Sequence, residues 1–145
     1  PEEKLIIAGD GEEKNKILSF IKKNKLENNI ILVGYLNNIQ FYMKNAKCFI
    51  LSSLWEDPGF VLAEAAAARL LTISSDCDSG PKELIEDNVN GILFLSNNSQ
   101  SLFSKIEKSI FLHEKKINKM IYENLKRSKK FTLFSHSQML IRLLS

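Results

Sequence analysis

The chain has 145 residues, of which 44% are hydrophobic and 26% are charged, and its formal net charge is +3. These values are typical of an ordinary soluble globular domain and exclude disordered, collagen-like and fibrous chains. The lysines fall mainly in polar stretches, where they could be solvated helix surface or could attract anionic lipid or an anionic ligand. We expect no nucleic-acid partner.

The apolar runs predict strands, and the amphipathic stretches between them predict helices. In chain order, strands are expected at 5–8, 30–33, 48–51, 70–73 and 92–94. Helices are expected from 12 to about 26, at 39–46, 60–68 and 82–86, and from 99 onward with a break near 130–132. Strands that alternate with helices and are apolar throughout predict a parallel α/β sheet covered on both faces.

The two cysteines, Cys48 and Cys77, lie in or beside apolar runs and lack metal-ligand spacing. Free thiols in a reducing compartment are therefore expected. No apolar run is long enough to span a membrane, and no signal peptide opens the chain. Because the sequence begins almost directly with a strand, we expect further sequence before it. The reducing compartment expected from the free thiols predicts a cytoplasmic protein.

In an open α/β sheet, ligands bind beyond the carboxyl ends of the strands. Polar or glycine-containing segments follow four of the predicted strands: Gly9 to Gly11, Gly34-Tyr35, Ser52 to Gly59, and Ser75 to Gly80. Gly9 could let the backbone approach a ligand closely, although a plain turn explains a Gly-x-Gly equally well. The third glycine of the dinucleotide fingerprint is absent, which disfavours a nicotinamide dehydrogenase.

The most informative stretch runs from Glu56 to Glu64. Gly59 and Phe60 would stand at a helix N-terminus, whose free N–H groups and dipole suit a diphosphate. Glu64, about one turn inside, could accept hydrogen bonds from two ribose hydroxyls, and Glu56 could reach hydroxyls beyond the phosphates. Spacing alone favours the simpler interpretation, in which Glu56 and Asp57 are acids stabilised by the helix dipole and Glu64 is a surface residue.

Several segments resemble, in the same order, the GT-B family of retaining glycosyltransferases, family 4. Residues 53–65 resemble its Glu-x7-Glu motif, and 5–11 resemble its strand and Gly-x-Gly turn. Residues 31–35 resemble its next strand and glycine, 74–85 its Ser-Asp-Cys-x-x-Gly-Pro-x-Glu segment, and 90–94 its Asn-Gly-hydrophobic run. Several motifs in register are far more specific than any one of them.

The resemblance implies a Rossmann-like three-layer domain with a parallel sheet, the C-terminal half of a GT-B glycosyltransferase. Residues 1–145 would form one nucleotide-sugar-binding domain, with a core at 1–111 and C-terminal helices at 112–145. The N-terminal acceptor domain and the family's basic pair on the diphosphate would lie outside this chain. The isolated domain is therefore expected to be inactive.

The resemblance also implies a reaction. A hexosyl group would pass from a nucleotide sugar, with UDP as the expected carrier, to an acceptor in bacterial polysaccharide or glycolipid synthesis. The anomeric configuration would be retained, and no metal or other cofactor would be required. The expected partners are the donor, the missing N-terminal domain and a lipid-linked acceptor, with a peripheral position on the inner face of the membrane as one option.

Roles for individual residues follow from the same resemblance. Glu56 would be the catalytic residue, contacting hydroxyls of the transferred sugar near the reacting centre, and Glu64 would hold the donor ribose. The backbone of Gly59 and Phe60 would meet the distal phosphate and the sugar. The remaining donor-binding residues would border the nucleobase or line the same wall: Gly9, Gly34, Tyr35 and Ser53.

Two segments and three aromatic side chains leave open questions. Residues 66–71 lack the glycine and proline that the family usually shows there, which concerns loop shape. Residues 131–144 resemble the family's closing helix, and we expect its apolar face to be partly uncovered: Leu133, Phe134, Leu140, Ile141 and Leu144. Trp55 could stack on a sugar or form part of the core. His113 and His136 are expected to be structural or surface residues.

Two alternative functions remain at this point. A non-catalytic nucleotide-binding or interaction module could keep the fold without the chemistry, although both glutamates and the Gly59-Phe60 pair argue against it. A GT-B epimerase acting on a nucleotide sugar would use other acids, and the Pro-Gly-Phe context fits it poorly.

Overall fold

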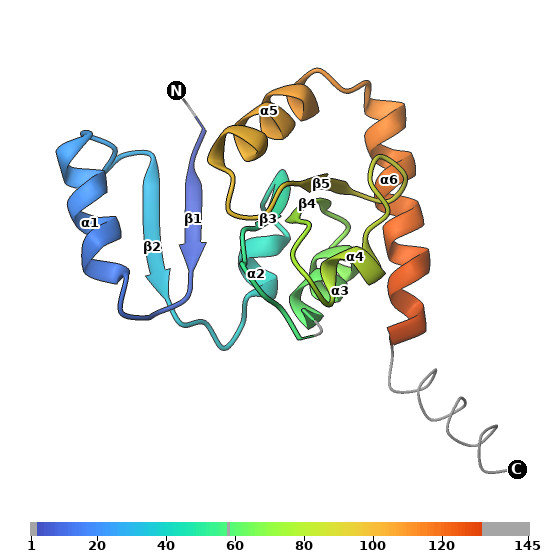
Figure 1. The fold of residues 1–145 in the computed structure, drawn as a ribbon, viewed down its shortest axis with the longest axis horizontal. Helices are drawn as coiled ribbons and strands as arrows, with labels where there is room; N and C mark the ends of the chain where they lie inside the picture. The colour runs from blue at the N-terminus through green and yellow to red at the C-terminus, as the bar shows by residue number, and fades with distance from the viewer. Residues whose placement is uncertain (1–2, 58, 132–145) are drawn as a thin grey trace, which may run out of the picture. The chain divides into compact units, whose positions relative to one another are not determined.

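The computed structural model describes residues 3–57 and 59–131. The chain divides into two compact units, residues 1–41 and 42–145, and each unit is described by itself. Figure 1 shows the elements of both units. The apolar face expected at residues 133–144 lies outside the described residues.

The first unit contains strand β1 (Leu5–Ala8), helix α1 (Lys14–Lys23) and strand β2 (Ile30–Gly34). The two strands are parallel, with a register shift after Ile7 that pairs Ala8 with Gly34. Helix α1 ends earlier than the apolar spacing predicts because Lys25 adopts a left-handed conformation, with φ of 56°. The N–H of Leu26 then donates to the carbonyl of Ile21 at 3.0 Å, which closes the last turn.

Helix α2 (Gln40–Met43) spans the sequence boundary between the units. In the second unit, strands and helices again alternate along the chain. Its strands are β3 (Cys48–Leu51), β4 (Leu71–Ser75) and β5 (Ile92–Phe94), paired in the order β3-β4-β5 and parallel throughout. Its helices are α3 (Phe60–Ala67), α4 (Pro81–Leu84), α5 (Ser99–Ile110) and α6 (Glu114–Ser128), followed by a 3₁₀ turn (Lys129–Phe131).

Alternate residues of the three-stranded sheet face opposite layers of helices. One face packs against Met120 of α6 and partly buried residues of α5 and α6, using Leu71, Ile73, Ile92 and Phe94. The other face packs against Leu62 of α3 and the end of α4, using Phe49, Leu51 and Leu93. All five residues of β4 are buried, as expected for a central strand covered on both sides. The predicted Rossmann-like, parallel three-layer α/β fold is confirmed.

The turn between α3 and β4 forms without the glycine that the resembled family usually has within residues 66–71. Arg69 adopts a left-handed conformation there, with φ of 59°. The N–H of Leu70 donates to the carbonyl of Ala65 at 3.1 Å, so the helix ends in the manner that usually favours glycine. The strand consequently starts at Leu71 and runs to Ser75, beyond the predicted end at Ile73.

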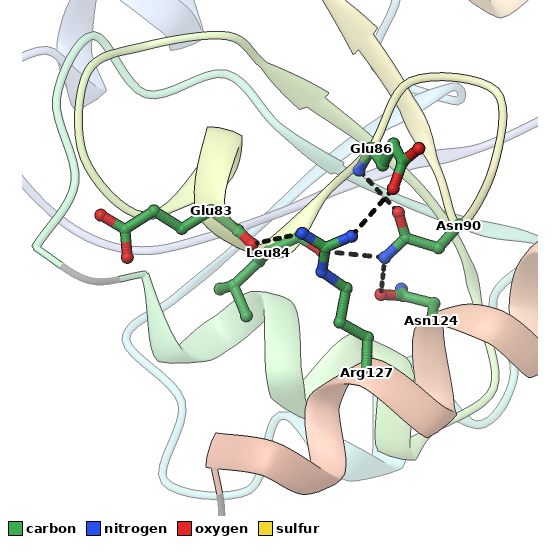
Figure 2. A network of polar contacts seen from close by, with 6 residues as sticks. All are labelled: Glu83, Leu84, Glu86, Asn90, Asn124 and Arg127. Carbon is green, nitrogen blue, oxygen red and sulfur yellow. Dashed lines mark hydrogen bonds and ion pairs between the residues drawn. The ribbon is translucent and has the colours of Figure 1, made fainter.

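A buried polar network joins α6 to the turn between α4 and β5 (Figure 2). Asn90 is 2% exposed; its Oδ1 accepts from the Glu86 N–H at 2.6 Å, and its Nδ2 donates to the Leu84 carbonyl at 2.8 Å. The same Nδ2 donates to Oδ1 of Asn124 at 3.3 Å. Nδ2 of Asn124 donates to Oγ1 of Thr72 in β4 at 3.1 Å. The network thereby ties α6 to the centre of the sheet.

Arg127 closes this network at its exposed rim (Figure 2). Its Nη1 lies 3.1 Å from the Glu86 carboxylate, and its Nη2 donates to the Glu83 carbonyl at 3.0 Å. Exposed ion pairs contribute little to stability, so the hydrogen bonds of the buried asparagines are expected to supply most of the stabilisation from this network. No buried side-chain nitrogen or oxygen of the described residues lacks a hydrogen-bond partner.

Candidate functional site

The loop after β3 is organised around the carboxylate of Glu56. Oγ of Ser53 donates a hydrogen bond to Oε1 of Glu56 at 2.5 Å. The other oxygen, Oε2, faces Gly59, since a Cβ built on that glycine would lie 3.4 Å from it. The half-buried carboxylate is therefore held between Ser53 and the start of α3.

Gly59 directly precedes α3 as its N-cap residue and has a left-handed conformation, with φ of 75° and ψ of 50°. This conformation favours glycine because a side chain would be strained there. The first N–H groups of a helix have no intrahelical acceptor, and together with the helix dipole they favour an anion. The Glu56 carboxylate already lies beside this helix end, and a phosphate would be favoured by the same groups.

Helix α3 presents one face to the core and another outward. Leu62, Ala65 and Ala66 are buried, whereas Phe60 and Glu64 are exposed. Residues four apart lie on the same side of a helix, so Phe60 and Glu64 share the outward face. The structure thus brings Gly59, Phe60 and Glu64 together along the first turns of α3, as the sequence predicts.

The carboxyl edge of the three-stranded sheet is tied together by side chains of β4 and the residue after it. Oγ of Ser75, which is fully buried, donates to the Ser53 carbonyl at 2.6 Å. The N–H of Asp76 donates to the Phe94 carbonyl at 2.8 Å, and Oδ1 of Asp76 accepts from the Ser96 N–H at 2.7 Å. The sequence places Ser75 in a polar segment at the carboxyl end of a strand but gives no sign of its hydrogen bond to Ser53, because the two residues are 22 positions apart.

Three predicted donor-binding residues lie in the first unit. The N–H of Gly9 donates to the Gly34 carbonyl at 2.8 Å, and both glycines have positive φ, 138° and 70°. Tyr35 follows directly and is exposed. Gly9, Gly34 and Tyr35 therefore gather at the carboxyl ends of β1 and β2, forming a cluster within that unit.

Asp10 follows β1 and is held by the turn into α1. Its carboxylate accepts from Nζ of Lys14 at 2.9 Å and from the Gly11 N–H at 2.9 Å. The hydrogen bond from Lys14, and after it that from Gly11, lower the pKa of this exposed carboxyl. Asp10 is thus engaged in local structure.

Several open interpretations are decided by burial and contacts. Trp55 is 66% exposed, so the interpretation as part of the core is wrong. His113 precedes α6, and its Nδ1 accepts from the Lys115 N–H at 3.3 Å, a structural role as expected. His136 lies outside the described residues. Cys48 is half-buried and Cys77 buried, and both are free thiols.

The described residues form neither a metal-binding cluster nor a membrane-spanning helix. Within residues 3–57 and 59–131, no three His, Cys, Asp or Glu side chains gather in a way that could hold a metal ion. None of the helices in that same part of the chain has both the length and the apolar character needed to cross a bilayer.

Comparison with known proteins identifies the family. The model of the family "Glycosyl transferases group 1" matches residues 1–128. An uncharacterized glycosyltransferase of Methanocaldococcus jannaschii is 43% identical over 90 residues, which are 62% of this chain and 22% of that protein. The N-acetylgalactosamine-N,N'-diacetylbacillosaminyl-diphospho-undecaprenol 4-alpha-N-acetylgalactosaminyltransferase of Campylobacter jejuni is 33% identical over 121 residues, which are 83% of this chain and 32% of that protein.

A solved structure extends the comparison to the fold. A TarM variant from S. aureus, in complex with fondaparinux, alpha-GlcNAc-glycerol and UDP, matches 97% of this chain and 28% of its own, with a TM-score of 0.84 and 26% identity. The chain spans about a third or less of the length of the two curated relatives. The predicted membership of a glycosyltransferase family is confirmed, and this chain belongs to the glycosyl transferases of group 1.

Proposed function

We propose that this chain is the donor-binding domain of a retaining glycosyltransferase that transfers a hexosyl group from a UDP-sugar. The observation that carries the proposal is the geometry around α3. A carboxylate, that of Glu56, is held beside a glycine-started helix N-terminus, and a second carboxylate, that of Glu64, is exposed one turn further along. Membership of the glycosyl transferases of group 1 supports this assignment.

Each part of this arrangement suits one part of a nucleotide sugar. The first N–H groups of α3, at Gly59 and Phe60, would bind the distal phosphate and stabilise the charge that develops on the leaving diphosphate. Glu64 would accept hydrogen bonds from the ribose hydroxyls. Glu56 would bind hydroxyls of the transferred sugar and orient its ring, and no metal is needed in this scheme.

The nucleotide and the acceptor are proposed from the relatives. The TarM variant holds UDP, which supports uridine as the base of the donor. The Campylobacter jejuni relative is named for a diphospho-undecaprenol substrate, which supports a lipid-linked acceptor in glycan synthesis. We place the reaction on the cytoplasmic face of the membrane. The acceptor domain and the basic pair would come from sequence outside this chain, so the chain by itself should not turn over.

Calorimetric titration of the full-length protein with UDP, GDP and ADP tests the proposal. UDP should bind best, and Glu64→Ala should weaken it roughly ten- to a hundredfold, because one or two hydrogen bonds to a charged group are lost. Glu107→Ala is the matched control, since Glu107 is also an exposed helical glutamate but lies on α5. If the full-length protein bound none of the three nucleotides, the interaction-module alternative would replace the proposal.

A further inference from the structure

We propose that Ser75 and Ser53 are positioning residues that orient the Glu56 carboxylate through two consecutive hydrogen bonds. The inference rests on the proposed function and deepens it, because it identifies what sets the geometry of the group expected to bind the transferred sugar. Neither serine needs to touch the donor for this role.

The two bonds run from the sheet to the carboxylate. Ser75 ends β4 and is 0% exposed; its Oγ donates to the Ser53 carbonyl at 2.6 Å, across 22 residues of sequence. Ser53 in turn donates from its own Oγ to Oε1 of Glu56 at 2.5 Å. Ser53 therefore accepts from the sheet with its backbone and donates to Glu56 with its side chain, which connects a rigid strand to a loop carboxylate.

The loop needs such an anchor because few of its other side chains are buried. Leu54, Trp55 and Asp57 are all exposed, so apolar packing does little to hold this segment in one conformation. A buried hydrogen bond is stronger in its low-dielectric surroundings than the same bond in water. A sugar-binding carboxylate must be held to within about 0.5 Å, which requires support from neighbouring groups.

Transferase kinetics of the full-length protein test the role, with Ser74→Ala as the matched control. Ser74 is also 0% exposed in β4, but its Oγ donates to the Ser75 carbonyl within the strand. Ser53→Ala and Ser75→Ala should each lower kcat by about tenfold, with a much smaller change in the donor KM. Ser53→Ala removes a hydrogen bond to the charged Glu56 carboxylate, and Ser75→Ala removes the bond that supports Ser53. Ser74→Ala should change kcat by less than about twofold, and Ser53→Thr should restore most of the activity that Ser53→Ala loses.

A double-mutant cycle shows whether the serines act through Glu56. In a Glu56→Ala background, adding Ser53→Ala or Ser75→Ala should cause no further loss, because the group they position is gone. Equal losses in both backgrounds would show that the serines act elsewhere and would overturn the inference.

Hydrogen–deuterium exchange of the loop provides a readout that does not depend on activity. Amides of residues 53–57 should exchange faster in Ser75→Ala than in Ser74→Ala, because only the former releases the loop. Equal exchange in the two variants would refute the link from β4 to the loop. Activity that depends on Glu56 but is indifferent to both serines would overturn this inference and leave the proposed function standing. Faster loop exchange in a protein that neither binds nor uses nucleotide sugars would overturn the proposed function alone.

Discussion

Replacement of Asn124 by alanine should destabilise the protein through the network in Figure 2. Asn124 is 4% exposed, accepts from Nδ2 of Asn90 at 3.3 Å and donates to Oγ1 of Thr72 at 3.1 Å. Asn90 keeps two other hydrogen bonds, from its Nδ2 to the Leu84 carbonyl and from the Glu86 N–H to its Oδ1, and Thr72 keeps the bond from its Oγ1 to the Leu70 carbonyl. The variant therefore loses two hydrogen bonds and leaves two partly satisfied buried groups.

The magnitude follows from those two bonds. Each hydrogen bond contributes about 1 kcal/mol net, so the loss is about 2 kcal/mol. Alanine is a better helix former than asparagine by roughly 0.6 kcal/mol, which offsets part of the loss. Asn118→Ala is the matched control, because Asn118 lies on the same helix and is exposed. The control receives the same gain in helix propensity, so the two variants should differ by about 2 kcal/mol, the loss from the buried contacts alone.

Urea unfolding of the chain, followed by far-ultraviolet circular dichroism, measures this difference. Fluorescence is less suitable because Trp55, the single tryptophan, is already exposed in the folded protein. Equal slopes with respect to urea would show that the variants unfold between comparable states. If Asn124→Ala and Asn118→Ala agreed to within about 0.5 kcal/mol, the buried bonds would contribute nothing measurable and the reasoning would be refuted.

Four further outcomes are expected. Arg69→Gly should raise the free energy of unfolding by about 0.5–1 kcal/mol in the same assay, because glycine relieves the left-handed strain at φ of 59°; an unchanged or lower value would contradict this. Gly59→Ala should lower the free energy of unfolding by about 1 kcal/mol, because alanine is strained at this positive φ. It should lower transferase activity by more than the loss of folded protein explains, because the added side chain would lie against the Glu56 carboxylate; activity that only follows the folded fraction would argue against the site. Glu56→Gln should lower kcat about tenfold or more with little change in UDP affinity, and an unaltered kcat would remove Glu56 from the catalytic machinery. Lys14→Met should raise the pKa of Asp10 towards its ordinary value in an NMR titration, and any stability from this exposed pair should be present at neutral pH and lost as the pH falls through the lowered pKa.

Local sequence features predicted most of the fold. Three of the five strands, at 5–8, 48–51 and 92–94, have the predicted bounds, because short apolar runs flanked by glycine or polar residues leave little choice of register. The start of α3 at Phe60 was also predictable, since a proline and a glycine precede an alanine-rich run. Helix ends were less predictable, because Lys25 and Arg69 adopt the left-handed conformation that usually indicates glycine.

The sequence by itself therefore determined the alternation of strands and helices, the family and the candidate residues, since these depend on preferences and motifs that act over a few neighbouring positions. Only the tertiary structure decided which of those residues cooperate. Ser75 reaches Ser53 because β3 and β4 pair in parallel, and Asn90 reaches Asn124 across 34 residues because α6 packs back on the sheet. Such contacts depend on how distant elements pack, and no local pattern in the chain encodes that packing.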